Sequence, residues 1–209
     1  HVSAIGADKQ SKSDYARTKG LAEAAVLETV KSAVILRPSI IFGPEDGFFN
    51  KFAAMARYSP MLPLIGGGET KFQPVYAGDV AEAIARSVEG QLSGGKVYEL
   101  GGSEVRTFKE LMQETLTVTE RKRILLPIPF WAAKIIGSIA GLLPSPLLTR
   151  DQVTLLESDN VVSDKAVKDG RTLEGIGITP RTMEAILPTY LWRFRARGQF
   201  PAASSTTAS

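Results

Sequence analysis

The chain has no cysteine and a single histidine among its 209 residues. Without cysteine it has no disulfide bond, no thiolate nucleophile and no cysteine-ligated zinc site, and this composition suits a reducing compartment. The one histidine is the first residue, His1, so no histidine cluster is present to hold a metal ion. We therefore predict no metal site.

An excess of charge of one sign is also absent. Lys and Arg number 25 and Asp and Glu 22, which gives a net charge of +3. This balance lacks the strong positive field of a nucleic-acid-binding protein. Residues 192–197 interleave arginine with aromatic side chains, but they follow the end of an expected helix, where cations interact favourably with the helix dipole. We expect no nucleic-acid partner.

Long uninterrupted apolar runs are missing as well. Residues 124–148 are the most apolar stretch, but four prolines and Lys134 reduce the expected helix to 130–143. A span of the bilayer needs about 20 apolar residues, so we expect none here. This segment is either a core helix or a surface helix that contacts a membrane or a partner beside the basic residues 121–123. In the second case, the contact stripe is Phe130, Trp131, Ile135 and Ile139.

What the sequence does contain is a tyrosine and a lysine at helical spacing. Tyr15 and Lys19 lie four residues apart in a predicted helix over 13–31, so they share one face. The lysine ammonium is expected to lower the pKa of the phenol, because it favours the charged form. Ser3 belongs to a short alternating run that resembles a late strand and leads to the same helix. Together the three side chains predict an acid–base site for carbonyl or alcohol chemistry.

Further segments predict an α/β fold. Residues 33–38 form a continuous apolar run of the kind that is buried on both faces of a parallel sheet. Residues 96–100 indicate another strand. Thr107 and Glu110 form a capping box that begins a helix extending through Leu116.

The order of these motifs resembles the extended or atypical short-chain dehydrogenase/reductase superfamily. Ser3 and the Tyr15-x-x-x-Lys19 pair are followed by residues 37–44, Arg-Pro-Ser-Ile-Ile-Phe-Gly-Pro, and by the 72–81 segment. Within the superfamily, four shorter segments are similar to the branch that contains the nucleotide-binding accessory subunit of respiratory complex I and its bacterial relatives: 48–52, 73–76, 126–129 and 148–153. The resemblance covers residues 1–195.

The resemblance implies a fold and a division into domains. The fold is the later part of a Rossmann-like doubly wound parallel sheet, with a smaller and mostly helical substrate-side region. Residues 1–102 would form the dinucleotide domain, from which 43–78 project to the substrate side. Residues 103–200 would form the smaller domain, and 201–209 are expected to be disordered because they have no apolar pattern.

The resemblance also implies a cofactor, NAD or NADP, and the residues that contact it. Lys19 would bond the nicotinamide ribose, Tyr15 would lie beside the nicotinamide, and Ser3 would orient a substrate oxygen. The cofactor-binding turn after the buried strand would lean on the nicotinamide carboxamide; its residues are Pro38, Ser39, Ile40 and Ile41.

The superfamily's amino-terminal glycine-rich turn, which holds the dinucleotide phosphates, has no counterpart here. The densest glycine cluster, 66–68, follows prolines and precedes an expected strand, which is typical of a tight turn. The chain also opens on His1, without an initiator methionine, in what resembles a late strand. We therefore expect it to be the carboxyl-terminal part of a longer protein.

Two functions of different classes follow. The first is an NAD(P)H-binding protein with a nucleotide-binding or assembly role near the membrane, whose partners are the dinucleotide and either respiratory-complex subunits or the membrane surface. The alternative is an active NAD(P)-dependent oxidoreductase or epimerase that uses Ser3, Tyr15 and Lys19 on a nucleotide-sugar, quinone-like or isoprenoid substrate. Both predict a cytoplasmic protein, and the first adds peripheral attachment to the inner face of the inner membrane.

Overall fold

The computed structural model of the protein describes residues 1–141 and 148–198. The prediction for 201–209, and that for the last two residues of the 130–143 helix, lie outside this part of the chain. Strand β1 (Ile35–Pro38) pairs in parallel with β6 (Val97–Leu100), and Val2 makes a parallel bridge to Leu36 on the other side of β1. These three parallel segments confirm the expected α/β fold with a Rossmann-like sheet.

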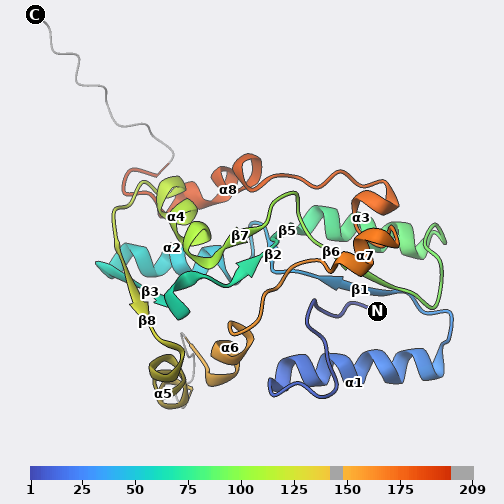
Figure 1. Ribbon diagram of the computed structural model, residues 1–209. Helices are drawn as coiled ribbons and strands as arrows, with labels where there is room; N and C mark the ends of the chain where they lie inside the picture. The colour runs from blue at the N-terminus through green and yellow to red at the C-terminus, as the bar shows by residue number, and fades with distance from the viewer. Residues whose placement is uncertain (142–147, 199–209) are drawn as a thin grey trace, which may run out of the picture.

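Helices cover both faces of this sheet (Figure 1). Helix α1 (Asp14–Thr29) lies on one face, and α3 (Ala77–Val88) lies on the other. The first core forms between the sheet and α3, because α3 turns Val80 and Ala83 inward at helical spacing. Its buried residues are Leu36, Val75, Val80, Ala83, Leu92, Tyr98, Leu100, Leu173 and Ile178.

Three further strand pairs extend the structure away from α1. Strands β2 (Ile41–Phe42) and β5 (Val75–Tyr76) are parallel, and so are β3 (Met61–Ile65) and β8 (Ile124–Ile128). Strand β4 (Lys71–Phe72) pairs with β7 (Arg106–Thr107) in the antiparallel sense. The turn Gly66–Gly68 precedes β4, as predicted for a tight turn.

A second core lies among α2 (Phe49–Tyr58), α4 (Phe108–Val118) and α8 (Met183–Leu191). Phenylalanine rings dominate it, and they meet edge to face: the Phe48 and Phe52 centroids are 5.1 Å apart, and those of Phe48 and Phe108 are 5.9 Å apart. Helix α4 begins at the capping box that the sequence predicts, with Thr107 and Glu110 bonded to each other's backbone amides.

The remaining described elements follow β8. They are α5 (Phe130–Ala140), α6 (Arg150–Leu155), α7 (Asp164–Lys168), and the short 3-10 turns η2 (Glu174–Ile176) and η3 (Trp192–Phe194). The β3–β8 pairing joins the 43–78 segment to the 103–200 segment. Leu173 and Ile178, however, pack in the first core, beside the sheet. The predicted domain division therefore stays a prediction.

Candidate functional site

Helix α1 carries Tyr15 and Lys19 in its first two turns. It begins one residue later than predicted, because Ser13 is its N-cap and accepts a hydrogen bond from the Ala16 amide at 3.3 Å. The Lys19 Nζ lies 5.8 Å from the centroid of the Tyr15 ring, and it donates a long hydrogen bond of 3.5 Å to the Val2 carbonyl. Lys19 thus lies between the Tyr15 ring and residues 1–5, an extended segment that bonds to β1 through the Val2 bridge and that we call the Ser3 strand.

The loop before α1 approaches the helix closely at Gly20. A side-chain carbon at that position would lie 2.5 Å from the Lys9 amide nitrogen and 2.6 Å from the Asp8 carbonyl carbon. Only glycine leaves room for this approach. The loop is thereby packed against α1, and the Asp8 amide donates to the Ala16 carbonyl at 3.1 Å.

Ser3 is buried, and its backbone amide donates to the Leu36 carbonyl at 2.7 Å. Its Oγ has no hydrogen-bond partner among the residues that the structure describes. A buried hydroxyl left without a partner costs about 1–3 kcal/mol. Such a group is a natural contact for a bound ligand, and the strand that carries it is the one Lys19 contacts.

The predicted cofactor-binding turn joins β1 to β2: Pro38 is the last residue of β1 and Ile41 the first of β2. Pro38 accepts a hydrogen bond from the Ile5 amide at 2.9 Å, so this turn lies beside the Ser3 strand. Ile40 packs against the second core, and Ile41 is partly exposed. The turn and the Ser3 strand therefore end at the same edge of the sheet.

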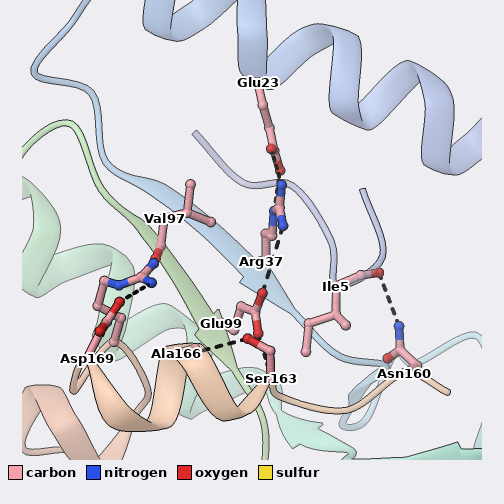
Figure 2. Close-up of polar contacts among 10 residues, drawn as sticks. Ile5, Glu23, Arg37, Val97, Glu99, Asn160, Ser163, Ala166 and Asp169 are labelled. Atoms are coloured by element: carbon pink, nitrogen blue, oxygen red, sulfur yellow. Dashed lines mark hydrogen bonds and ion pairs between the residues drawn. The ribbon is translucent and has the colours of Figure 1, made fainter. Parts of the chain in front are cut away.

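Ser39 in the same turn is occupied by a protein contact that the sequence did not predict. Its Oγ lies 2.6 Å from Oδ1 of Asn160, which also accepts from the Ile40 amide at 3.2 Å. Asn160 Nδ2 donates to the Ile5 carbonyl at 3.2 Å (Figure 2). One asparagine thus ties the turn to the Ser3 strand, and the Ser39 hydroxyl is engaged within the protein.

The electrostatic prediction for Tyr15 is wrong in direction. The side chain is about half exposed, and desolvation by its burial raises the pKa of the Tyr15 phenol above the usual 10.0. Burial disfavours the charged phenolate, and desolvation is the cause of this shift. The Tyr15 phenol therefore keeps its proton at neutral pH, and it is a weaker acid than a fully solvated phenol.

A buried ion-pair network lies between α1 and the sheet (Figure 2). Arg37 Nε and Nη2 donate to Glu23 at 2.8 and 2.6 Å, and Arg37 Nη1 lies 3.8 Å from a Glu99 oxygen. The other Glu99 oxygen accepts from the Ser163 amide at 2.8 Å. The hydrogen bonds to Glu23 raise the pKa of Arg37, although its burial opposes them. Because the contact with Glu23 is bidentate, it fixes the orientation of α1 on β1.

Helix α5 lies on the surface, and the prediction of its contact stripe is only partly correct. Trp131, Ile135 and Ile139 are 70%, 56% and 67% exposed. Ile136 is also exposed, whereas Phe130 packs against the second core. Of the two alternatives for this segment, the described residues support the surface helix.

The sequence suggested that the basic residues 121–123 lie beside this helix, but the structure places them away from it. The five residues of β8 separate them from it, a length of about 16 Å at 3.3 Å per residue. Arg121 and Arg123 also donate to the backbone carbonyls of Phe194 and Ala56. In the described ranges, no helix is both long and apolar enough to cross a membrane.

The residues of this site fit the nicotinamide end of a dinucleotide. The Tyr15 ring is half exposed, and among the described residues the Lys19 ammonium makes one long hydrogen bond, so both are open to a ligand. The Ser3 hydroxyl lies beneath them, buried and without a partner in the described part of the chain. A cavity of about 730 Å³ lies elsewhere, where Lys96 and Tyr98 of the β6 region face Arg171, and it includes none of the three.

Comparison with known proteins shows which family the chain is similar to. Residues 5–102 match the model of the 3-beta hydroxysteroid dehydrogenase/isomerase family. The chain is 35% identical over 207 residues to the Arabidopsis thaliana protein named NADH dehydrogenase [ubiquinone] 1 alpha subcomplex subunit 9, mitochondrial, and this match covers 94% of the chain and 50% of the relative. It is 31% identical over 151 residues to the 2-alkyl-3-oxoalkanoate reductase of Stenotrophomonas maltophilia, covering 66% of the chain and 46% of that protein.

Among solved structures, the UDP-glucose 4-epimerase of Thermotoga maritima with UDP-glucose superposes with a TM-score of 0.64 at 17% identity, over 92% of this chain and 62% of the epimerase. That likeness shows the fold alone. The chain spans about half the length of the curated relatives it matches. These findings confirm the resemblance to the short-chain dehydrogenase/reductase superfamily and, within it, to the alpha subcomplex subunit 9 of mitochondrial NADH dehydrogenase.

Proposed function

We propose that this chain forms the nicotinamide side of an NAD(P)H site in a protein with a nucleotide-binding or assembly role, similar to the accessory subunit that it resembles. The observation that carries this proposal is the pairing of the Lys19 ammonium with the half-exposed Tyr15 ring, next to the segment that carries Ser3. Within residues 1–141 and 148–198, the Ser3 hydroxyl has no hydrogen-bond partner and Lys19 makes one long bond, to the Val2 carbonyl. A ribose hydroxyl could accept from the ammonium in a charge-assisted hydrogen bond.

Each residue has a defined part in this proposal. Lys19 would bond the nicotinamide ribose, and Tyr15 would lie along the nicotinamide. The backbone of Pro38, Ile40 and Ile41 would contact the carboxamide, while Ser39 acts on the site indirectly through Asn160. The nicotinamide, when bound, supplies hydride chemistry. The sequence does not distinguish NAD from NADP.

The alternative function is catalysis on a small carbonyl or alcohol substrate, and one observation favours it. The Tyr15 ring is half exposed and shares a helix face with Lys19, so a substrate oxygen can reach the phenol, although the raised pKa makes this phenol a weaker acid than a solvated one. Ser3 would orient the substrate oxygen toward that phenol. A relative named as a reductase, at 31% identity over 151 residues, supports this class of reaction. Loss of all measurable reductase or epimerase activity in Tyr15→Phe is the expected sign of this function.

The nucleotide that co-purifies with the full-length protein tests the proposed function. We expect NAD(H) or NADP(H) to be released on denaturation and identified by mass, and its occupancy to fall in Lys19→Ala. Lys31→Ala is a matched control, because it removes the same charge just beyond the carboxyl end of α1. If no dinucleotide is released and none binds when added, the proposal is wrong.

We further propose that the exposed face of α5 is a docking surface for a protein partner, with subunits of a respiratory NADH:ubiquinone oxidoreductase as the expected class. The contiguous exposure of Trp131, Ile135, Ile136 and Ile139 supports docking, because monomeric proteins rarely leave large apolar patches uncovered. The distance of residues 121–123 from this helix weakens the case for an anionic membrane. The protein would then be attached to the inner membrane through its partner.

Fractionation distinguishes a protein partner from a membrane surface as the occupant of this face. Trp131→Glu is expected to remove the full-length protein from the respiratory-complex fraction without changing its melting temperature. Binding of the unaltered protein to protein-free vesicles of anionic lipid, lost in the same variant, would instead identify the membrane surface as the occupant.

A further inference from the structure

The amino-terminal end of α1 is held by a carboxylate from a distant part of the chain. Asp151, in the first turn of α6, accepts hydrogen bonds from the Asp14 amide at 2.8 Å and the Tyr15 amide at 3.2 Å. The Ser13 hydroxyl donates to the same carboxylate at 3.1 Å. Three polar groups of one helix end therefore converge on a side chain more than 130 residues away in the sequence.

Local capping does not explain this contact. Ser13 already caps α1 by accepting from the Ala16 amide, as an N-cap serine does. The first turn also has its own carboxylate, Asp14, but that side chain pairs with Arg17 on the same helix. Asp151 satisfies amides that are otherwise free at a helix start, and it places a negative charge at the positive end of the helix dipole.

Helix α6 is itself held in a fixed place. Thr149 and Gln152 form a capping box around its first turn, which sets the direction of Asp151. On its other side α6 packs against α5, where a side-chain carbon at Gly137 would lie 2.9 Å from the Arg150 amide nitrogen. Lys134 of α5 and Glu157, just after α6, form an ion pair at 2.7 Å. Figure 1 shows α6 between α5 and α1.

We propose that Asp151 is a positioning residue, which fixes the first turn of α1 and so sets where Tyr15 lies relative to the Ser3 strand. The importance of Tyr15 rests on the proposed function, whereas the contact itself does not. The Tyr15 amide donates a hydrogen bond to Asp151, so a shift of the carboxylate moves the backbone that carries the phenol. Lys19, one turn further along, would move less.

The charges around this turn predict the direction in which the pKa of Tyr15 changes when Asp151 is replaced. Contacts place these charged side chains at the first turn of α1: Asp14, Arg17 and Lys19 on α1 itself and Asp151 on α6. Removal of the Asp151 charge favours the phenolate and leaves the positive helix end uncompensated. A loosened first turn also exposes the Tyr15 ring to more water. All three effects lower the pKa of the Tyr15 phenol.

The experiment uses full-length protein with ring-labelled tyrosine, and NMR follows the titration of Tyr15, whose signal Tyr15→Phe identifies. We expect Asp151→Asn, which keeps the side-chain shape, to lower the pKa of Tyr15. In the same variant, exchange of the Tyr15 amide hydrogen should become at least about tenfold faster. Asp14→Asn is the matched control, because it removes one carboxylate from the same turn without touching α6.

Three outcomes would overturn the proposal: an unchanged Tyr15 pKa in Asp151→Asn, unchanged exchange of its amide, or an equal fall of the pKa in Asp14→Asn. The last result would indicate a general charge effect instead of a contact. If Asp151→Asn does not fold, Asp151→Ser is measured in its place, because a hydroxyl can still accept one amide. Neither readout needs a bound dinucleotide, so a failure of the proposed function is recognised separately by titration with NADPH.

Discussion

The region around α1 and the region around α5 are stabilised in opposite ways. Helix α1 is held by directional polar contacts: the Arg37–Glu23 pair below it and the Asp151 carboxylate at its start. Helix α5 buries Ala133 but exposes Trp131 and its apolar neighbours. Hydrogen bonds fix the direction of a helix, whereas apolar packing is tolerant of direction.

This difference matches the function proposed for each region. A site that binds and orients a nicotinamide needs side chains held to within a fraction of an ångström, and a polar network provides that fixity. A docking surface needs exposed apolar area, and its orientation is set when the partner binds. Helix α6 contacts both regions, so the two are mechanically joined.

The largest effect is expected from Arg37→Ala, which removes the ion pairs that hold α1 on the sheet. It leaves Glu23 buried and Glu99 partly buried without their partner, and this loss costs about 3–4 kcal/mol in the free energy of unfolding, toward the low end of the range for a fully buried pair. Urea unfolding measures it. Arg106→Ala is the control, because its pair with Glu104 is largely exposed and contributes about 0–1 kcal/mol. Similar losses in the two variants would show that the network is unimportant.

The second prediction compares two positions of α5. Ala133 is fully buried, so Ala133→Glu should lower the free energy of unfolding by about 2–4 kcal/mol through overpacking and burial of a polar group. Trp131→Glu should change it by no more than about 0.5 kcal/mol, because that side chain is on the surface. Thermal and urea unfolding of both variants test this, and a collapsed melting temperature in Trp131→Glu would place that face in a core.

The third prediction concerns a buried polar contact within the apolar second core. The Tyr190 hydroxyl donates to Asp46 at 2.6 Å, and burial followed by this hydrogen bond raises the pKa of Tyr190 well above 10.0. The contact stabilises the fold fully below about pH 10 and is lost as the pH rises above it, because the unfolded phenol ionises first. Tyr190→Phe should cost about 2 kcal/mol at pH 8 and less at pH 11. A constant cost at both pH values would contradict this assignment.

Much of the fold could be predicted from local patterns. The apolar run 33–38 contains β1, and the capping box at Thr107 marks the start of α4, because both depend on residues close in sequence. The Tyr15 and Lys19 pair was predicted from its spacing together with the order of the neighbouring motifs, and the structure places Lys19 against the Ser3 strand.

What could not be predicted depends on distant residues or on burial. Asn160 and Asp151 contact groups more than 100 residues away, and no spacing rule connects them. The pKa of Tyr15 was mispredicted because the sequence shows a neighbouring lysine but not the desolvation of the ring. The exposure of α5 was undecided because apolar residues suit a core and a docking surface equally.

Calorimetric titration of the full-length protein with NADPH and NADH tests the central claim most directly. Lys19→Ala should weaken binding by about ten- to hundredfold, or about 1.5–3 kcal/mol, because it removes a charge-assisted hydrogen bond. Tyr15→Phe should change binding by no more than about twofold, since the phenol acts mainly on the substrate oxygen. Equal losses in the two variants, or no binding by the unaltered protein, would contradict the assignment of α1 as the nicotinamide side of the site.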